Sequence, residues 1–415
     1  CGGGIAATVN AIAHLIAGGF PPELLDVTVT LLRIMTPAVW FLALSGVVTG
    51  VLFALERFTF PAFAAAVYNI GVIVAALAFH KQLGIYALAV GVLLGSVMQL
   101  GMQLPDLRRA RVGISLRLRH PALRRIWLLY LPILFGLAVS QVQVVIDRRL
   151  ASGTGEQSLA WMRDATTLIQ LPHGLVAVAI SLAALPALSR FFAAGDEASF
   201  RGTLGRGLRT VLVLIVPATV GLFVLARPIV ELVFQRGAFL PADTDAVVRA
   251  LRIYLFGLIP ASLDWLLNYT FYARNDTKTP AFVGVASVGI YLLFALPLVG
   301  RVGYLGLVFA DSAKHTGHFI IMLIMLHRRL GDLGDLRGQS TAWRTFLASL
   351  GMTLMLLLVL PLLDAVLPAG FEGNLLLVLV AMILGGAVYL VLIRLLKVEE
   401  AQRITDRIIG RLRRR

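Results

Sequence analysis

The sequence predicts an all-α, polytopic membrane protein, and three observations support this fold class. Hydrophobic residues make up 59% of the 415 residues and charged residues only 14%, against roughly a quarter charged in ordinary soluble domains. The mean hydropathy is +0.87, so the apolar side chains exceed what one or two globular cores could bury. Apolar stretches of roughly 20 residues, enough to cross a bilayer as a helix, recur along the chain. They lack the apolar–polar alternation of a membrane barrel.

Eleven stretches are long enough to span a membrane. They are residues 27–55, 61–80, 84–104, 126–150, 158–192, 204–226, 247–272, 280–299, 303–326, 343–367 and 374–396. An earlier stretch, residues 2–20, is also apolar but has neither a basic flank nor the pattern of a signal peptide. We interpret it as part of a membrane helix, and we expect the first helices of the protein to be missing from this chain.

The loops between the spans predict the orientation in the membrane. The formal net charge is +15, and the arginines concentrate in alternate loops, chiefly 105–125, 190–209 and 328–344, and in the tail 398–415. Because cytoplasmic loops carry the Lys and Arg excess, these segments and the C-terminus are expected to be cytoplasmic. The charge therefore indicates topology, not nucleic-acid binding. The tail also reads as a basic amphipathic helix lying on anionic membrane lipids, with a solvated cationic tail as the alternative.

A sequence repeat predicts two halves of similar structure. The tripeptide Pro-Ala-Phe begins a span at Pro61 and again at Pro280, 219 residues later, and the same separation carries Gly84 onto Gly303. An even number of spans lies between the copies, so the halves should have the same orientation. This is the parallel-repeat plan of two-lobed transporters, in which the substrate path runs between the lobes.

A first group of polar residues lies at the junction of two predicted spans. Ionisable groups within spans are costly and are therefore candidates for function. The group consists of Asp147, Arg148, Arg163, Asp164, Thr167 and Gln170. Its cations could bind a phosphate, or the group could be an ion-pair cap at the membrane surface. Arg33 is a separate cation that could face a cavity.

A second group lies in the middle of one span. Asp311, Lys314, His315 and His318 have i, i+3, i+4 and i+7 spacing and share one helical face. We expect them to line a cavity or to pair with Asp264, and histidines there could carry protons or sense pH. Structural pairing between helices is the alternative. The ligand set is too sparse for a transition metal, and no metal, cofactor or catalytic motif is predicted. The sequence thus favours a transporter over an enzyme.

Several motifs resemble one known family. They are LERFTFPAF at residues 55–63, VSQ to DRRLASG at 139–153, QLPHG to LPALS at 170–189, FQRGAF at 234–239 and FYARNDTKTP at 271–280. In these stretches the chain is similar to the MurJ/MviN family of lipid II flippases, within the multidrug/oligosaccharidyl-lipid/polysaccharide exporter superfamily.

The resemblance implies fourteen helices, in two six-helix lobes plus two C-terminal helices. On that map residues 1–120 are the remainder of the N-terminal lobe, 121–330 the second lobe, 331–397 the two further helices and 398–415 the tail. The implied cargo is lipid II or a similar undecaprenyl-linked glycan, moved to the outer leaflet of the bacterial inner membrane by alternating access. Its headgroup would cross through a cationic cavity, and cell-wall synthesis proteins are implied as partners.

The chain departs from the family pattern at two places. The position of the family's cavity arginine falls on Thr167, with Arg163 one turn earlier, and we expect Arg163 to substitute for it. The polar face that begins at Asp311 also differs from the apolar helix usual in the family. Two other functions therefore stay open at the sequence level: an ion-coupled exporter of drugs or oligosaccharide-lipids, and a non-transporting scaffold for envelope synthesis.

Overall fold

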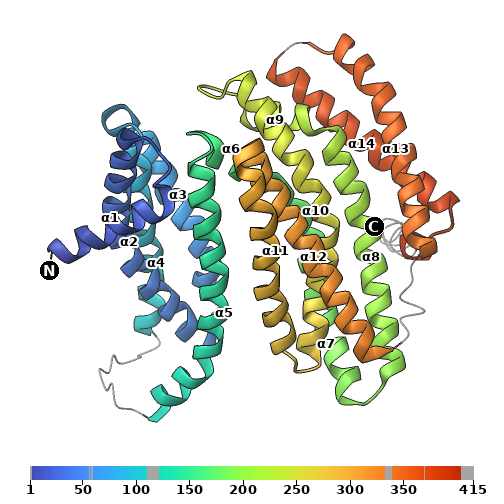
Figure 1. The fold of residues 1–415 in the computed structure, drawn as a ribbon, viewed down its shortest axis with the longest axis horizontal. Coiled ribbons are helices and arrows are strands. Elements are labelled where there is room, and N and C mark those ends of the chain that lie inside the picture. Colours follow the sequence, from blue (N-terminus) through green and yellow to red (C-terminus); the bar gives the residue numbers. More distant parts are fainter. Residues whose placement is uncertain are drawn as a thin grey trace. The chain divides into compact units, whose positions relative to one another are not determined.

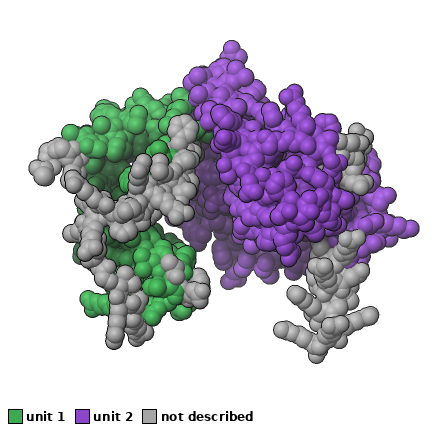
Figure 2. All heavy atoms as spheres, turned by 90° about the horizontal axis from the view of Figure 1, so that it is seen from below, with its two compact units in different colours: residues 1–153 green, residues 154–415 purple. Residues whose placement is uncertain are grey.

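The computed structural model describes residues 2–55, 57, 59–109, 121–331, 339–368 and 370–402, and every regular element among them is a helix (Figure 1). Much of the predicted basic loop 105–125 and the tail beyond residue 402 lie outside the described residues. The chain divides into two compact units, residues 1–153 and 154–415 (Figure 2).

The described residues of unit 1 form five helices. They are α1 (Gly2–Ala17), α2 (Pro22–Ala54), α3 (Thr59–Leu83), α4 (Tyr86–Arg109) and α5 (Pro121–Ser152). The end of α1 is tied to the end of α5 by a hydrogen bond from the Gly19 N–H to Ser152 Oγ, 3.2 Å long. Because α5 packs against α1, the compact unit ends about thirty residues after the lobe boundary expected at residue 120. The lobe assignment itself stays a prediction.

Unit 2 contains the remaining helices. They are α6 (Ser158–Pro172), the π-helix η1 (His173–Val178), α7 (Ala179–Ala193), α8 (Glu197–Val224), α9 (Ala226–Phe234), α10 (Pro241–Ala273), α11 (Lys278–Val302), α12 (Tyr304–Leu330), α13 (Gln339–Val366) and α14 (Phe371–Leu395). Helix α10 is the centre of this unit, because α6, η1, α7, α8, α9 and α12 all pack against it.

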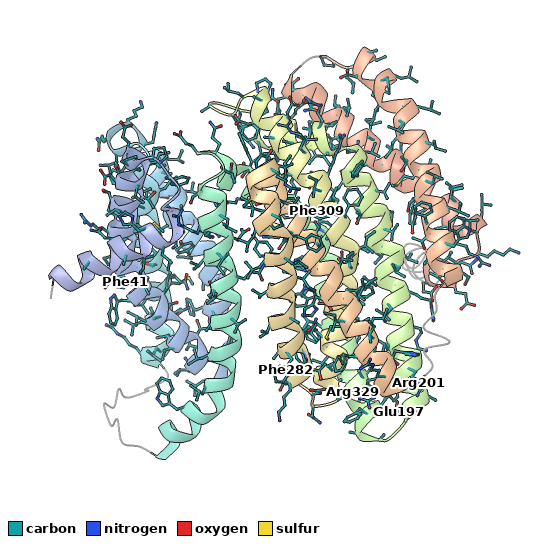
Figure 3. The ribbon with its side chains drawn as sticks, in the orientation of Figure 1. Phe41, Glu197, Arg201, Phe282, Phe309 and Arg329 are labelled. Atoms are coloured by element: carbon teal, nitrogen blue, oxygen red, sulfur yellow. The ribbon has the colours of Figure 1, made fainter. Side chains whose placement is uncertain are left out.

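Each of the eleven predicted spans is helical, to within a residue or two at its ends. Nine helical segments in the described part of the chain are long and apolar enough to cross a membrane: α2, α3, α4, the continuous segment α6–η1–α7, α8, α10, α11, α13 and α14. The two other predicted spans, α5 and α12, are helical as well but are not among these nine segments. Large apolar side chains such as Phe282 and Phe309 are exposed on the outside of unit 2, as expected for helices solvated by lipid (Figure 3).

The two halves of the predicted repeat have the same internal packing. In unit 1, α4 packs against both α2 and α3, and in unit 2, α12 packs in the same way against α10 and α11. Gly84 and Gly303, which the repeat aligns, both have positive φ, at 53° and 61°. Only glycine adopts such a conformation readily, and here it turns the chain sharply into the next helix. The structure therefore agrees with the repeat.

Arginines hold together the end of unit 2 at which α8 begins and α10 and α12 end. Arg201 donates to the carbonyl of Leu330, and Arg274 lies 3.4 Å from the Glu197 carboxylate. The Arg274 guanidinium also stacks over the Phe192 and Phe200 rings, at 5.2 and 5.6 Å from their centroids. Figure 3 shows Glu197, Arg201 and Arg329 at this end of the unit. The charge pattern predicts that it faces the cytoplasm.

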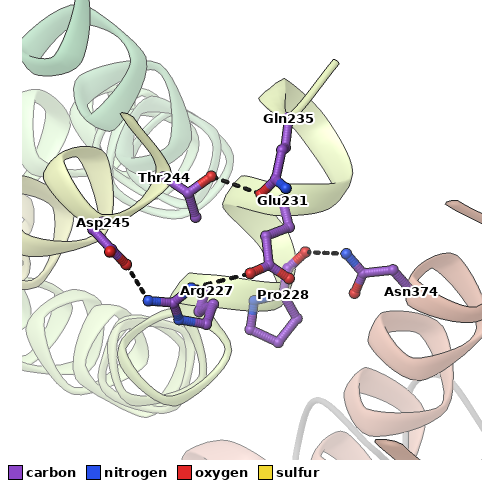
Figure 4. Close-up of polar contacts among 7 residues, drawn as sticks. All are labelled: Arg227, Pro228, Glu231, Gln235, Thr244, Asp245 and Asn374. Atoms are coloured by element: carbon purple, nitrogen blue, oxygen red, sulfur yellow. Dashed lines mark hydrogen bonds and ion pairs between the residues drawn. The ribbon is translucent and has the colours of Figure 1, made fainter. Parts of the chain in front are cut away.

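The short helix α9, which the hydropathy pattern did not predict, lies at the opposite end of unit 2 (Figure 1), and polar contacts fix it there (Figure 4). Its Arg227 pairs with Glu231 and with Asp245 of α10, and Thr244 of α10 donates a 2.8 Å hydrogen bond to Gln235. On the other side, Asn374 of α14 donates to the Pro228 carbonyl at 3.2 Å. These contacts connect α14 to α9, and α9 to α10, through polar groups.

The start of the C-terminal tail packs on protein. Val398 and Ala401 are buried in an apolar cluster with residues of α8, α13 and α14, and Glu400 pairs with Arg209. The tail was expected to place this apolar face on lipid. In its first turn, the described part of the tail buries that face against the helices instead.

Candidate functional site

One face of α6 is polar and exposed although the helix belongs to an apolar span. Arg163, Thr167 and Gln170 are all exposed, at i, i+4 and i+7, whereas Met162 and Ala165 on the other side are buried. The Thr167 hydroxyl donates a 2.9 Å hydrogen bond to the Arg163 carbonyl, so it is satisfied within the helix. The guanidinium of Arg163 is therefore the main charged group on this face.

The start of α6 is anchored to the centre of unit 2. The indole N–H of Trp161 donates a 2.9 Å hydrogen bond to Asp243 of α10, and its ring lies 5.2 Å from that of Tyr304 at the start of α12. Asp164 is half-buried next to Arg163. These contacts fix the rotation of α6, so that its polar face points away from α10.

The other residues predicted for this group lie in unit 1. Asp147 is half-buried near the end of α5, and Arg148 beside it is exposed. Arg33 on α2 donates a 3.1 Å hydrogen bond to the side chain of Asn10 on α1. A common surface formed by these residues and the polar face of α6 stays a prediction.

The second predicted group lies inside unit 2. The Lys314 ammonium is 2.5 Å from Asp311 Oδ1, and His315 Nε2 is 3.6 Å from Asp311 Oδ2. One turn further along α12, His318 Nδ1 is 2.9 Å from Oδ2 of Asp264 on α10. Pairing with Asp264 was one of the two arrangements expected for this face. A role of these residues in ion or proton coupling stays a prediction.

Sequence reasoning missed a third histidine of this cluster. His173 begins η1, where the backbone leaves α-helical geometry directly after Pro172. Its Nδ1 lies 3.2 Å from the Ser262 hydroxyl of α10, and its ring meets Trp265 edge-on at 5.8 Å. It is also near enough to Asp264 for their charges to interact. Single-turn π-helices are rare and are frequent at functional sites.

The described residues contain no group of three or more His, Cys, Asp or Glu side chains placed to hold a metal ion. The geometry allows two kinds of chemistry. The exposed cationic face of α6 can bind an anion by charge-assisted hydrogen bonds, and the histidine–aspartate cluster of α10, α12 and η1 can exchange protons.

Comparison with known proteins decides the family. The family model described as "Lipid II flippase MurJ" matches residues 5–381. The chain belongs to the MurJ family. The Burkholderia cenocepacia lipid II flippase MurJ is 31% identical over 337 residues, which cover 79% of this chain and 64% of that protein. A probable lipid II flippase MurJ of Haemophilus influenzae is 34% identical over 300 residues, covering 69% and 58% of the two chains.

The MurJ fold is also seen in a solved structure. A lipid II flippase MurJ in an inward closed conformation superposes with a TM-score of 0.76 at 21% identity, over 94% of this chain and 81% of that one. The chain is thus a multi-pass, all-α membrane protein of a transporter family, as the sequence predicted. It spans about three fifths of the length of the relatives named above.

Proposed function

We propose that the protein is a flippase that moves lipid II, a polyprenyl-pyrophosphate-linked peptidoglycan precursor, from the inner to the outer leaflet by alternating access. Membership of the MurJ family supports this function, since the relatives above are named lipid II flippases. In this proposal the protein lies in the bacterial cytoplasmic membrane with its C-terminus on the cytoplasmic side. Anionic lipids and cell-wall synthesis proteins would be its partners.

The main structural support for this proposal is the exposed polar face of α6. A guanidinium and a side-chain amide on one face of an apolar span are costly against acyl chains, so this face favours a water-filled path. The cargo has a diphosphate that must leave water to cross the membrane, and an arginine is the side chain best suited to bind it. Arg163 would make the direct contact, with Asp164, Thr167 and Gln170 orienting the headgroup.

In this proposal, residues of unit 1 would also contribute to the path. Arg148 and Arg33 would add positive charge along it, and Asp147 would limit the net charge so that the cargo can be released. Asp264, Asp311, Lys314, His315 and His318 would couple the movement to an ion or proton gradient, a role that the low exposure of Asp264, Lys314 and His318 supports.

Complementation tests the proposed function. The full-length gene should restore growth to a bacterium depleted of its own lipid II flippase, and Arg163→Ala should abolish that rescue at normal protein levels. Arg163→Lys should rescue in part, because an ammonium keeps the charge but lacks the forked geometry of a guanidinium. Arg190→Ala is the matched control, since this arginine is exposed on α7. Undiminished rescue by Arg163→Ala would remove Arg163 from the path, and absence of rescue by the unaltered gene would contradict the function.

A further inference from the structure

Asp264 is a buried carboxylate in the interior of unit 2. It lies on α10, nine residues before the end of that helix, and its side chain is 12% exposed. Its Oδ2 accepts a 2.8 Å hydrogen bond from Asn268, whereas no hydrogen bond reaches its buried Oδ1 among the described residues. A carboxylate ion in such a place is costly unless a positive charge or a proton compensates it.

His318 is the group placed to supply that compensation. Its Nδ1 is 2.9 Å from Asp264 Oδ2, which is the separation of an ion pair, although the two groups are not aligned as a hydrogen bond. The side chain of His318 is only 14% exposed. A proton on either partner makes the pair neutral overall, and its removal leaves a single buried negative charge.

The surrounding charges favour one bound proton. Asp311 is already balanced by Lys314 at 2.5 Å, so with neutral histidines the net charge of the cluster is that of the Asp264 carboxylate. One proton shared between Asp264 and His318 brings the cluster to zero, which is the state that a low-dielectric interior favours. His315 also lies near enough to both His173 and His318 for their charges to interact.

The helices packed around Asp264 contribute few other ionisable groups. The titratable and charged side chains facing this region are His173 from η1, Asp311, Lys314, His315 and His318 from α12, and Tyr269 and Tyr272 from α10 itself. The charged residues of α6 lie near its start, those of α8 in its first half, and α7 carries only Arg190 near its end. The ionisable residues of α9 are Arg227 and Glu231, fixed at the far end of the unit, and α11 has none between Lys278 and Arg301 except Tyr291.

The two histidines on this face of α12 differ in exposure. His315 is 41% exposed, whereas His318, three residues later on the same face of α12, is 14% exposed. His315 is therefore the more exposed of the two imidazoles and His318 the more buried one. His173 also lies near the Asp264 carboxylate. It is at the start of the π-helix η1, where the backbone departs from regular α-helical geometry.

We infer that Asp264 and His318 form a proton-binding site in the interior of unit 2, loaded through His315 and bordered by His173. The step is a simple transfer: one proton leaves water and occupies the pair, and its release returns a carboxylate, a neutral imidazole and a proton to water. That this proton biases the transport cycle rests on the proposed function. The binding of a proton at this site does not depend on the proposed function.

Proton binding can be measured directly on the full-length protein in lipid nanodiscs. Nitrogen NMR of labelled histidine should show a signal, absent in His318→Gln, that changes protonation state between about pH 5 and 8. In Asp264→Asn the midpoint of that signal should move by about one pH unit or more, since an opposite charge at this distance has been removed. His327→Gln is the matched control, because this histidine is exposed near the end of the same helix.

Three results of the titration would overturn the inference. One is a His318 signal that stays in one state over this pH range in both the unaltered protein and Asp264→Asn. Another is an identical midpoint in the two proteins. The third is a midpoint that depends on replacing potassium with sodium, because that would assign the site to a metal cation instead of a proton.

Flipping assays separate this inference from the proposed function. The rate of lipid II flipping in proteoliposomes should depend on pH for the unaltered protein and for His327→Gln, and the dependence should vanish in Asp264→Asn and His318→Gln. Normal flipping without a titrating His318 leaves the function standing and removes the proton site. A titrating His318 in a protein that flips nothing keeps the site and removes the function.

Discussion

Arg57 Nη1 lies 2.8 Å from Asp106 Oδ1, and this ion pair ties the loop after α2 to the last turn of α4. In unit 2, Asp276 and Arg329 tie the loop after α10 to the last turn of α12. The two pairs occupy corresponding places in the two copies of the repeat, but the carboxylate and the guanidinium have changed places. Both copies of the repeat therefore place an ion pair at this junction, and the loop supplies the cation in one copy and the carboxylate in the other.

Removing Arg57 should destabilise unit 1. Arg57→Ala leaves the mostly buried Asp106 without its partner, and we expect a loss of about 1 kcal/mol, kept small because Arg57 itself is more than a third exposed. Thermal unfolding of the purified protein in detergent measures the change. The exchanged pair, Arg57→Asp with Asp106→Arg, should recover part of the loss, as unit 2 has this arrangement. A double variant no more stable than Arg57→Ala would contradict the interpretation.

The Asp276 pair predicts a loss of stability in acid. Burial alone would raise the pKa of Asp276, but hydrogen bonds from Thr279 and the Arg329 charge outweigh it and hold the pKa below the usual 3.8. A group whose pKa is lower in the folded state stabilises the fold at pH values above its unfolded pKa. This contribution disappears as the pH falls below about 4 and through the folded pKa.

Acid titration of unfolding tests this. The melting temperature of Asp276→Asn should already be low at neutral pH and should fall less than that of the unaltered protein between about pH 5 and 3. Asp364→Asn, which changes an exposed carboxylate on α13, should keep the steeper acid dependence. Equal acid slopes for all three proteins would show that Asp276 contributes nothing.

The sequence predicts the helices of this protein better than its site. Every predicted span is a helix, because runs of twenty apolar residues leave few alternatives. Helix α9 was missed because nine residues are too short to give a hydropathy signal for a span. The π-helix at His173 was missed because its residue types do not distinguish a π-helix from an α-helix. The polar face of α12 could be found from spacing alone. The approach of His173 to α10 could not, because its neighbours lie about ninety residues away in the sequence.

The positive φ of Gly303 predicts a cost for any side chain at that position. Gly303 has φ 61° and ψ −140°, a conformation essentially restricted to glycine, while the nearest atom to an added Cβ would be 3.8 Å away. Gly303→Ala should therefore destabilise unit 2 by about 1–3 kcal/mol through backbone strain alone. Gly300→Ala, three residues earlier in α11 and with open space at its Cβ, should be neutral or stabilising. Equal effects of the two substitutions in thermal unfolding would exclude strain as the cause.

Close packing of α3 on α4 depends on two glycines that face each other. A Cβ on Gly95 would lie 2.5 Å from the Tyr68 carbonyl, and one on Gly71 would lie 2.5 Å from the Gly95 Cα. Small residues at such positions let helix backbones approach within a membrane. Gly95→Leu should separate the helices and lower the yield of folded protein on size-exclusion chromatography. Gly101→Leu on the same helix has free space and should leave it unchanged.

Docking of the C-terminal tail depends on Val398, which is 1% exposed in the cluster formed by α8, α13 and α14. Val398→Asp places an unpaired carboxylate in that cluster, so the segment after α14 should detach while the helices stay folded. Hydrogen exchange at residues 398–402 should then rise at least tenfold, and trypsin should cleave the basic tail faster. Gln402→Asp provides the control, because Gln402 is only half-buried and the added charge is the same. If Val398→Asp exchanged no faster than Gln402→Asp, the apolar contact would not be what holds the tail.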